Sequence, residues 1–315
     1  MLLNSLLLII GFVMLIKGAD IMVDGASGIA ENFKVPKMLI GLTIVAFGTS
    51  APELAVSIKS ILIGSGDIVL GNVIGSNILN ILLILGCSSL VHNLTVKNNT
   101  VKKELPITML ITTLFAVLLS DSIFDKGVVN TFTRADGIVV LLFFTVFIYY
   151  LISMSRNKAE VDSSEILSLP KSFLFTIIGI VGIVLGSNFV VDSATKIAAI
   201  MGVSERMIAL TIIALGTSLP ELVTSITATK KGEYDIAIGN VVGSNIFNIG
   251  VVIGIPVALF GGIGIISFSY IDLLIMLISA VLLFMFSFND YKITKKEGLL
   301  FLILFIAYYS YVIIG

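Results

Sequence analysis

Long apolar runs alternate with short polar stretches from one end of this chain to the other. Each run has about 20 residues, which is enough for a helix to cross a bilayer core of about 30 Å. The pattern predicts an all-α membrane protein with ten transmembrane helices, near residues 2–25, 36–63, 68–90, 105–120, 135–154, 170–198, 205–229, 235–260, 264–288 and 297–314.

The composition agrees with a lipid bilayer as the solvent. Hydrophobic residues make up 57% of the 315 residues and charged residues only 12%, whereas soluble domains carry about 25% charged residues. The formal net charge is −1 and no basic tract is present, so the sequence offers no surface for nucleic acid. Cys87 is the single cysteine and cannot form a disulfide within the chain.

Basic residues are distributed unequally between the two sets of alternate loops that ten spans create. One set holds thirteen lysine and arginine residues, and the opposite set holds only Lys126, Arg134, Lys196 and Arg206. Cytoplasmic loops carry the excess of basic residues in membrane proteins. We therefore expect a multi-pass protein of the plasma membrane, with both termini extracellular and the polar segment 155–169 in the cytoplasm.

The two halves of the sequence repeat each other at a constant offset of 168 residues. One segment begins at Ile40 and reads IGLTIVAFGTSAPELAVSI, and its copy begins at Ile208 and reads IALTIIALGTSLPELVTSI. A second pair of segments shares the pattern GN-x-x-GSN-x-x-N. We divide the chain into two five-helix repeats, 1–154 and 170–315, joined by the linker 155–169. Since five is an odd number, the second repeat must be inverted in the membrane, a plan common to many secondary transporters.

The first repeated segment combines helix-breaking residues with oxygen-bearing side chains. Pro52 removes a backbone N–H in the middle of a span, so the carbonyl of Gly48 loses its helical partner. Backbone at membrane depth is left unpaired only where it is buried in protein or lines a wet cavity. The hydroxyls of Thr49 and Ser50 and the carboxylate of Glu53 would share that cavity, so helices 2 and 7 are predicted to be broken at the core. The second repeat carries the same set as Gly216, Thr217, Ser218, Pro220 and Glu221.

The second repeated segment adds further oxygens on one helix face. Ser76 and Asn80 are four residues apart and share a face, as do their copies Ser244 and Asn248. Oxygen ligands without thiol or imidazole select hard cations such as Ca²⁺, Na⁺ or Mg²⁺. Hydrogen bonding between helices is an equally good interpretation for the remaining amides, Asn72, Asn77, Asn240 and Asn245.

Two carboxylates in a bilayer need neutralisation, because one acidic residue costs roughly 2.5–3.5 kcal/mol at the centre of a span. One Ca²⁺ balances the charge of Glu53 and Glu221, and so do two Na⁺. The site therefore holds one species or the other, which is the exclusion that an antiporter requires. Protonation of one glutamate in the empty site is the alternative, in which case protons are the coupling ion.

At these residues the chain resembles the cation/calcium exchanger superfamily. The two GTS-x-PE and the two GN-x-x-GSN-x-x-N segments look like its paired α-repeats, and the short linker looks like that of prokaryotic sodium/calcium exchangers. The resemblance implies a secondary active antiporter that exchanges Na⁺ for Ca²⁺ by alternating access. It implies cation ligands at Glu53, Glu221, Thr49, Ser50, Thr217, Ser218, Ser76 and Ser244, with carbonyls of Ala46 and Ala214. Asn248 stands where potassium-dependent members carry Asp, which argues against a K⁺ requirement.

Other functions leave fewer marks in the sequence. An intramembrane hydrolase needs a base beside its nucleophile, and His92, the only histidine, stands in a polar loop. We therefore expect no enzymatic activity and no cofactor, and we expect the chain to work as a monomer. A proton-coupled exchanger and a passive cation channel stay open as alternatives. Among the other acids, Asp67 and Asp235 are interpreted as helix N-caps and Asp272 as an isolated interfacial residue.

Overall fold

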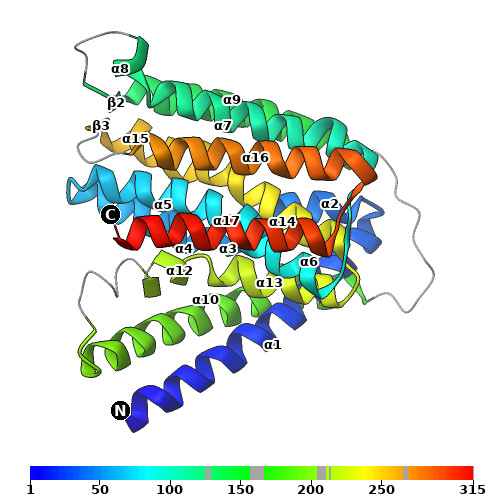
Figure 1. The fold of residues 1–315 in the computed structure, drawn as a ribbon. Coiled ribbons are helices and arrows are strands. Elements are labelled where there is room, and N and C mark those ends of the chain that lie inside the picture. The colour runs from blue at the N-terminus through cyan, green and yellow to red at the C-terminus, as the bar shows by residue number, and fades with distance from the viewer. Residues whose placement is uncertain (125–128, 157–166, 204–210, 213, 265–268, 315) are drawn as a thin grey trace.

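The computed structural model describes residues 1–124, 129–156, 167–203, 211–212, 214–264 and 269–314. Its regular structure is almost entirely helical (Figure 1). The helices of the first half are α1 Leu2–Phe33, α2 Lys37–Ile40, α3 Ala46–Thr49, α4 Ala51–Leu62, α5 Gly66–Leu79, α6 Gly86–Val91, α7 Leu105–Leu118, α8 Asp121–Phe124 and α9 Arg134–Ser155. Those of the second half are α10 Leu169–Ile200, α12 Ala214–Gly216, α13 Leu219–Lys230, α14 Tyr234–Phe247, α15 Gly254–Phe260, α16 Tyr270–Asp290 and α17 Lys295–Ile314.

Wider π-helical turns connect several of these helices without a break in the rod. They are η1 Gly41–Val45, η2 Asn80–Leu85, η3 Thr100–Glu104 and η5 Asn248–Ile253. The turns η2 and η5 begin at equivalent positions of the two halves, directly after the polar stripes of α5 and α14. Such π-helical turns occur frequently at functional sites.

Two small strand pairs, which the sequence did not predict, join loops at the ends of the helices. Strand β1 Leu94–Thr95 pairs antiparallel with β4 Lys292–Ile293, and β2 Thr131–Phe132 pairs antiparallel with β3 Ile263–Gly264. Each strand has two residues, so the pairs connect loops of opposite halves and leave the helical class unchanged.

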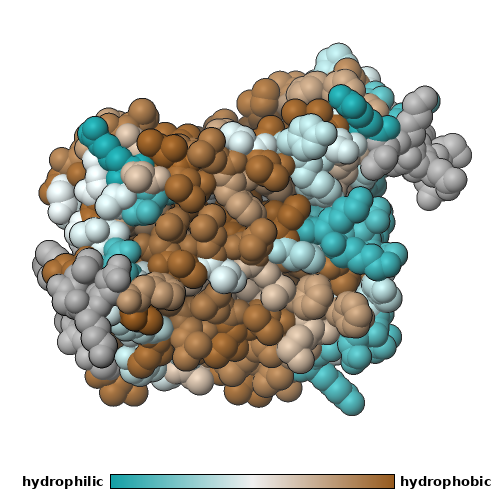
Figure 2. Space-filling view, turned by 90° about the horizontal axis from the view of Figure 1, so that it is seen from above, coloured by the Kyte–Doolittle hydropathy of each residue, from teal (hydrophilic) through white to brown (hydrophobic). Residues whose placement is uncertain are grey.

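The helices run roughly side by side, and their ends gather at two faces of the molecule. Figure 1 shows both chain termini at the left, whereas α9 ends and α10 begins at the right. Seen from above, the surface between these ends is mainly hydrophobic and its hydrophilic residues lie toward the two sides (Figure 2). An apolar belt between two polar ends is the surface of a protein that crosses a bilayer.

Seven helices of the described chain are long and apolar enough to cross a membrane, and the bent pair Lys37–Thr49 and Ala51–Leu62 brings the number to eight. Two of the ten predicted spans are not among them. The helix α7 in the predicted span 105–120 has only 14 residues, and the charged turn η3 precedes it. The predicted span 205–229 includes residues 204–210 and 213, which lie outside the described part of the chain.

The helices α1 and α10 pack against each other in antiparallel orientation along a seam of glycines. A Cβ atom on Gly18 would lie 2.9 Å from the Gly179 carbonyl oxygen, and one on Gly179 would lie 2.5 Å from Met22 Cβ. Only glycine permits backbones to approach this closely. The seam makes α1 and α10 one unit that combines the first helix of each half.

The helices that carry the repeated polar segments lie at the centre of the bundle. In the most apolar window of Tyr234–Phe260, 89% of the residues are buried, and the corresponding share for Gly66–Val91 is 72%. For Lys295–Ile314 the share is 11%, so α17 faces the lipid. The fold therefore encloses the polar stripes of α5 and α14 within protein and leaves apolar side chains outside.

Candidate cation site

The first broken helix places Glu53 at the start of a helix inside the membrane. The span from Lys37 to Leu62 bends by 47° at Ser50, whose backbone leaves helical geometry with φ −83° and ψ 7°. Pro52 lies in the first turn of α4, where its missing N–H costs no hydrogen bond. Glu53 lies in the same turn, where the positive end of the helix dipole stabilises a carboxylate.

The second half repeats this break. Thr217 and Ser218 form the turn between α12 and α13, and Ser218 has φ −87° and ψ 2°. Glu221 lies in the first turn of α13, directly after Pro220. Ala214 is the first residue of α12. The same short sequence therefore interrupts the helix in the same way in both halves.

The Glu221 carboxylate receives hydrogen bonds from both halves of the chain. Ser50 Oγ, from the first half, donates to Glu221 Oε1 at 3.0 Å, and Ser244 Oγ donates to the same oxygen at 3.4 Å. Glu221 is 1% exposed. Hydroxyl donors of two separate broken or striped helices thus converge on one buried carboxylate.

Glu53 occupies the equivalent place with the halves exchanged. It is also 1% exposed, and the hydroxyls of Thr217 and Ser218 from the second half interact with its carboxylate. The carboxylates of Glu53 and Glu221 are close enough to repel each other electrostatically. The structure therefore brings together the two acids that the sequence analysis singled out, in one buried region.

The polar stripes of α5 and α14 border the same region. Ser76, Asn80, Ser244 and Asn248 are each at most 3% exposed. Ser218 Oγ donates to Ser76 Oγ at 3.4 Å, a contact between the halves that mirrors the approach of Ser244 to the other break. All four residues singled out on these stripes therefore lie in the protein interior.

The amides of Asn72 and Asn240 hold the broken helices in place. Asn72 Nδ2 donates to the Glu53 carbonyl at 3.0 Å and to Ser57 Oγ at 3.1 Å. Asn240 Nδ2 donates to Ser225 Oγ at 2.9 Å and to the Glu221 carbonyl at 3.4 Å. For these two residues, which the sequence left open, the structure shows hydrogen bonding between helices.

Ala46 and Thr49 have most of their hydrogen-bonding capacity occupied. The Ala46 carbonyl accepts from the Ser50 backbone N–H at 3.0 Å and lies 3.3 Å from Thr49 Oγ1. Thr49 Oγ1 approaches Asn240 Oδ1 more closely, at 3.0 Å, so its proton points there. A carbonyl has two lone pairs and a hydroxyl has acceptor capacity besides its donor, so both groups keep an oxygen lone pair for a ligand.

Four buried oxygens in this region have no hydrogen-bond partner among the described residues. They are Oε2 of Glu53, Oε2 of Glu221, Oδ1 of Asn80 and Oδ1 of Asn248. An unpartnered buried polar atom costs about 1–3 kcal/mol, and a bound ion is one of the few causes that explain it in a native protein. Each half supplies one carboxylate oxygen and one amide oxygen, a set that suits a hard cation. Within the described chain, no three His, Cys, Asp or Glu side chains group as a metal site, so amides and hydroxyls must complete any shell.

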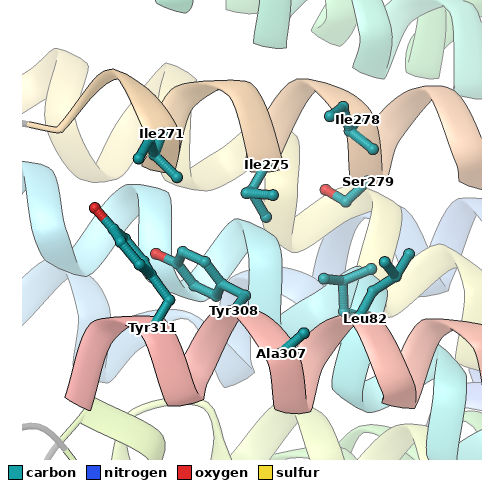
Figure 3. Close-up of a pocket in the computed structure, with 9 residues that line it drawn as sticks. Leu82, Ile271, Ile275, Ile278, Ser279, Ala307, Tyr308 and Tyr311 are labelled. Carbon is teal, nitrogen blue, oxygen red and sulfur yellow. The ribbon is translucent and has the colours of Figure 1, made fainter. Parts of the chain in front are cut away.

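A separate hollow of about 250 Å³ lies between α16 and α17 (Figure 3). The rings of Tyr308 and Tyr311 project from α17 toward Ile271 and Ile275 of α16, and Ser279 lies at the other end. The lining that the structure describes is otherwise aliphatic and contains no carboxylate. This hollow suits hydrocarbon rather than a cation, and it is distinct from the region around the glutamates.

Sequence reasoning missed two acids that bind tyrosines away from the cation site. Tyr150 donates its hydroxyl proton to the fully buried Glu104, and Tyr308 donates to Asp272 at 3.0 Å. The interpretation of Asp272 as an isolated acid is therefore wrong. Glu104 and Asp272 stand 168 residues apart, the offset of the repeat, and this spacing is the signal that could have revealed both pairs.

Ion pairs join the helices where α1 ends and α14 begins. Lys231, which follows α13, lies 2.7 Å from a carboxylate oxygen of both Asp20 and Asp24. Burial lowers the pKa of the Lys231 amine, but the hydrogen bonds to the two carboxylates raise it more, so the pKa lies above its usual value. Asp235 pairs with Lys97 and makes no cap to α14, so its interpretation as an N-cap is wrong. Lys37 pairs in addition with Glu31 and Glu233.

The comparison with known proteins agrees with this geometry. The family model described as "Sodium/calcium exchanger protein" matches residues 3–153 and 171–314. The chain belongs to the sodium/calcium exchanger family. This exchanger is 37% identical over 274 residues to the inner membrane protein YrbG of Escherichia coli strain K12, which covers 83% of the chain and 82% of YrbG. It is 31% identical over 340 residues to the sodium/calcium exchanger MaX1 of Methanosarcina acetivorans, with 97% of both chains covered.

A solved structure supports the same assignment. The exchanger superposes on the sodium-calcium exchanger NCX_Mj, soaked with 2.5 mM Na⁺ and 0.1 mM Ca²⁺, with a TM-score of 0.84, 32% identity and 97% of both chains covered. The resemblance drawn from the repeated motifs is thereby confirmed at the level of the family. The protein is a multi-pass membrane transporter of the cation/calcium exchanger type and not an enzyme.

Proposed function

We propose that this protein is a secondary active antiporter that exchanges Na⁺ for Ca²⁺ by alternating access. The transported ions are its substrates, and they bind one after the other to a single buried set of oxygens. The proposed ligands are the side chains of Glu53, Glu221, Thr49, Ser50, Thr217, Ser218, Ser76, Ser244, Asn80 and Asn248 and the carbonyls of Ala46 and Ala214. These ligands belong to one chain, so a monomer is the proposed functional unit.

The observation that carries the proposal is the set of four unpartnered oxygens, one carboxylate and one amide oxygen from each half. Hydrogen bonds alone leave these atoms unsatisfied, and no lysine or arginine pairs with either glutamate in the printed ion pairs of the described residues. A cation would satisfy all four and would neutralise the two repelling carboxylates. This is why cation binding, rather than helix packing alone, is the favoured role of the repeat.

Charge explains why two kinds of ion would exclude each other at this site. Glu53 and Glu221 together carry a charge of −2, which one Ca²⁺ or two Na⁺ would balance. A bound Ca²⁺ together with two Na⁺ would leave an excess positive charge in a low-dielectric interior, where unpaired charge is very costly. Release of Ca²⁺ therefore has to accompany Na⁺ entry. The printed names of MaX1 and NCX_Mj, both sodium/calcium exchangers, favour this ion pair over Ca²⁺ with protons.

The arrangement of the chain supports the rest of the proposal. We infer ten helices in two inverted repeats, 1–154 and 170–315, with 155–169 as a cytoplasmic linker and both termini outside the cell. Antiparallel packing of α1 and α10 fits inversion, and termini at the same end of the molecule fit an even number of spans (Figure 1). The excess of basic residues at the opposite end supports the orientation.

Calcium uptake into sealed vesicles tests the proposal. The purified protein is reconstituted, the vesicles are loaded with Na⁺, K⁺ or acid buffer, and radioactive Ca²⁺ uptake is measured after dilution. We expect uptake driven by an outward Na⁺ gradient, without a requirement for K⁺. Uptake driven only by a proton gradient would favour the proton-coupled alternative, and uptake that needs no counter-ion gradient would favour a channel.

Substitution of the glutamates tests the site. Glu53→Gln and Glu221→Gln each remove one of two charges that must balance Ca²⁺, so we expect exchange to fall at least about 100-fold while the protein stays folded. Glu104→Gln is the matched control, because Glu104 is equally buried but lies away from the unpartnered oxygens. Near-normal exchange by Glu53→Gln would contradict the proposed site.

A further inference from the structure

Two buried amides, Asn77 and Asn245, face each other across the boundary between the halves. They stand 168 residues apart and are 1% and 2% exposed. Asn77 Nδ2 donates to the Asn245 main-chain carbonyl at 3.3 Å, and Asn245 Nδ2 donates to the Asn77 main-chain carbonyl at 3.3 Å. This reciprocal pair uses the donor end of both side chains and leaves the acceptor ends for other partners.

The acceptor end of each amide binds a proposed ligand residue of the opposite half. Asn80 Nδ2 donates to Asn245 Oδ1 at 2.9 Å, and Asn248 Nδ2 donates to Asn77 Oδ1 at 3.0 Å. The Oδ1 atoms of Asn80 and Asn248 thereby point away from these bonds and are the two unpartnered amide oxygens of the site. Four amides thus form one closed arrangement in which the donor and acceptor ends are all assigned.

The orientation of an asparagine matters at a cation site because its two ends differ in chemistry. The carbonyl end is an oxygen ligand, whereas the NH₂ end presents two protons that repel a cation. If the Asn80 amide rotated by 180°, its oxygen would face Asn245 Oδ1, which is also an acceptor. Its NH₂ group would then be directed to where Oδ1 now lies, without the bond to Asn245. The network therefore excludes the orientation that would oppose ion binding.

We infer that Asn77 and Asn245 are positioning residues that hold the carbonyl oxygens of Asn248 and Asn80 toward the transported cation. Each orients a ligand of the other half, so the amide ligands are set correctly only when the two halves are docked. The inference rests on the proposed function, because it presumes a cation at the four unpartnered oxygens. It assigns a role to two residues that contribute no unpartnered oxygen of their own.

A double-mutant cycle on Ca²⁺ binding tests the inference. The full-length protein in detergent is titrated with radioactive Ca²⁺ in the absence of Na⁺, as wild type, Asn245→Ala, Asn80→Ala and the double variant. We expect each single variant to weaken binding about tenfold, and the double variant to bind no more weakly than Asn80→Ala alone. Residues that act through a common contact give such non-additive effects.

The crossed pair supplies a matched control. Asn245→Ala leaves the Asn245 main-chain carbonyl in place, so Asn77 keeps its donor bond and continues to orient Asn248. The losses caused by Asn245→Ala and Asn248→Ala should therefore multiply, whereas those of Asn77→Ala and Asn248→Ala should not. A purely structural role would lower the unfolding temperature of the ion-free protein but would not produce this pattern of coupling.

The outcomes separate the inference from the function on which it rests. A wild-type protein that binds no Ca²⁺ would overturn the proposed function and this inference with it. A wild-type protein that binds Ca²⁺, combined with losses that multiply in the Asn245–Asn80 cycle, would overturn the inference alone. If Asn245→Ala does not fold, Asn245→Ser, whose hydroxyl is too short to reach Asn80, replaces it in the same cycle with the same expected result.

Discussion

The contact between α14 and the first broken helix provides a sharp test of the packing around the site. Gly243 of α14 faces the segment that leads to the break at Ser50. A Cβ atom built on Gly243 would lie 2.7 Å from Ala46 Cβ, 2.9 Å from Leu42 Cα and 3.0 Å from the Leu42 carbonyl oxygen. Two of these atoms belong to the backbone, so no side-chain rotation relieves the overlap. Gly243→Ala must therefore move the two helices apart.

The size of the effect follows from the overlap. Carbon atoms in contact prefer a separation of about 3.5–4.0 Å, so the helices must separate by roughly 1 Å at Gly243. Overpacking of this kind costs about 1–3 kcal/mol. The change from glycine to alanine within a helix returns about 1 kcal/mol through helix propensity. We expect Gly243→Ala to range from nearly neutral to about 2 kcal/mol less stable than wild type.

Gly75→Ala is the matched control because the repeat places it at the equivalent position of α5. No described atom lies within 4 Å of a Cβ built on Gly75, which borders a hollow of about 120 Å³. The gain in helix propensity is common to both variants, so their difference isolates the overpacking at Gly243. Thermal unfolding in detergent should place Gly243→Ala below Gly75→Ala by roughly 2–5 °C, given about 2 cal/mol/K per residue of unfolding entropy.

Equal unfolding temperatures of the two variants would refute this reasoning. Such a result would mean that η1 and α3 shift away from α14 at no cost, and that the glycine at position 243 serves only helix flexibility. A less stable Gly75→Ala would contradict it as well, because the structure shows open space at that position.

Two further predictions concern polar contacts outside the cation site. Tyr150→Phe leaves the fully buried carboxylate of Glu104 without its donor, so we expect a loss of about 1–3 kcal/mol in thermal or denaturant unfolding with transport coupling unchanged. Lys231→Met removes two partly exposed ion pairs with Asp20 and Asp24, and we expect a loss of about 0.5–2 kcal/mol that shrinks in high salt. Because the pKa of Lys231 is raised, this difference should be fully present below the ordinary pKa of 10.5 and disappear as the pH rises through the folded-state value. A difference that instead grew with pH or salt would exclude the ion pairs as its cause.

The elements that the sequence predicted well are those that local physics determines. The break near Ser50 follows from Pro52, which cannot donate a backbone hydrogen bond, and the structure bends at that residue. The polar stripes of α5 and α14 follow from the four-residue spacing of Ser76 and Asn80, which puts them on one helix face. The duplication adds a second, independent statement of both features. This redundancy made the buried pair of glutamates predictable before any contact was known.

The contacts that the sequence could not provide join residues far apart along the chain. Asn80 and Asn245 are 165 residues apart, and nothing local distinguishes an amide that binds an ion from one that binds another amide. Tyr150 lies 46 residues from Glu104, and Lys97 lies 138 from Asp235. Such partners depend on helix packing, which hydropathy does not encode. The interpretation of an acid at a helix start as an N-cap fails for the same reason.

The two halves match in their ligands but differ in their surroundings. Each supplies one glutamate and one asparagine oxygen to the buried set, whereas Gly243 is packed against the first broken helix and Gly75 borders a hollow. In a strictly symmetric molecule the same motif would have the same neighbours, so this difference marks the packing that can change while the ligands stay paired. An antiporter needs both properties. Its ion must keep its oxygens while the water-accessible side changes, and an exchange of packing between two equivalent halves achieves this without new ligands.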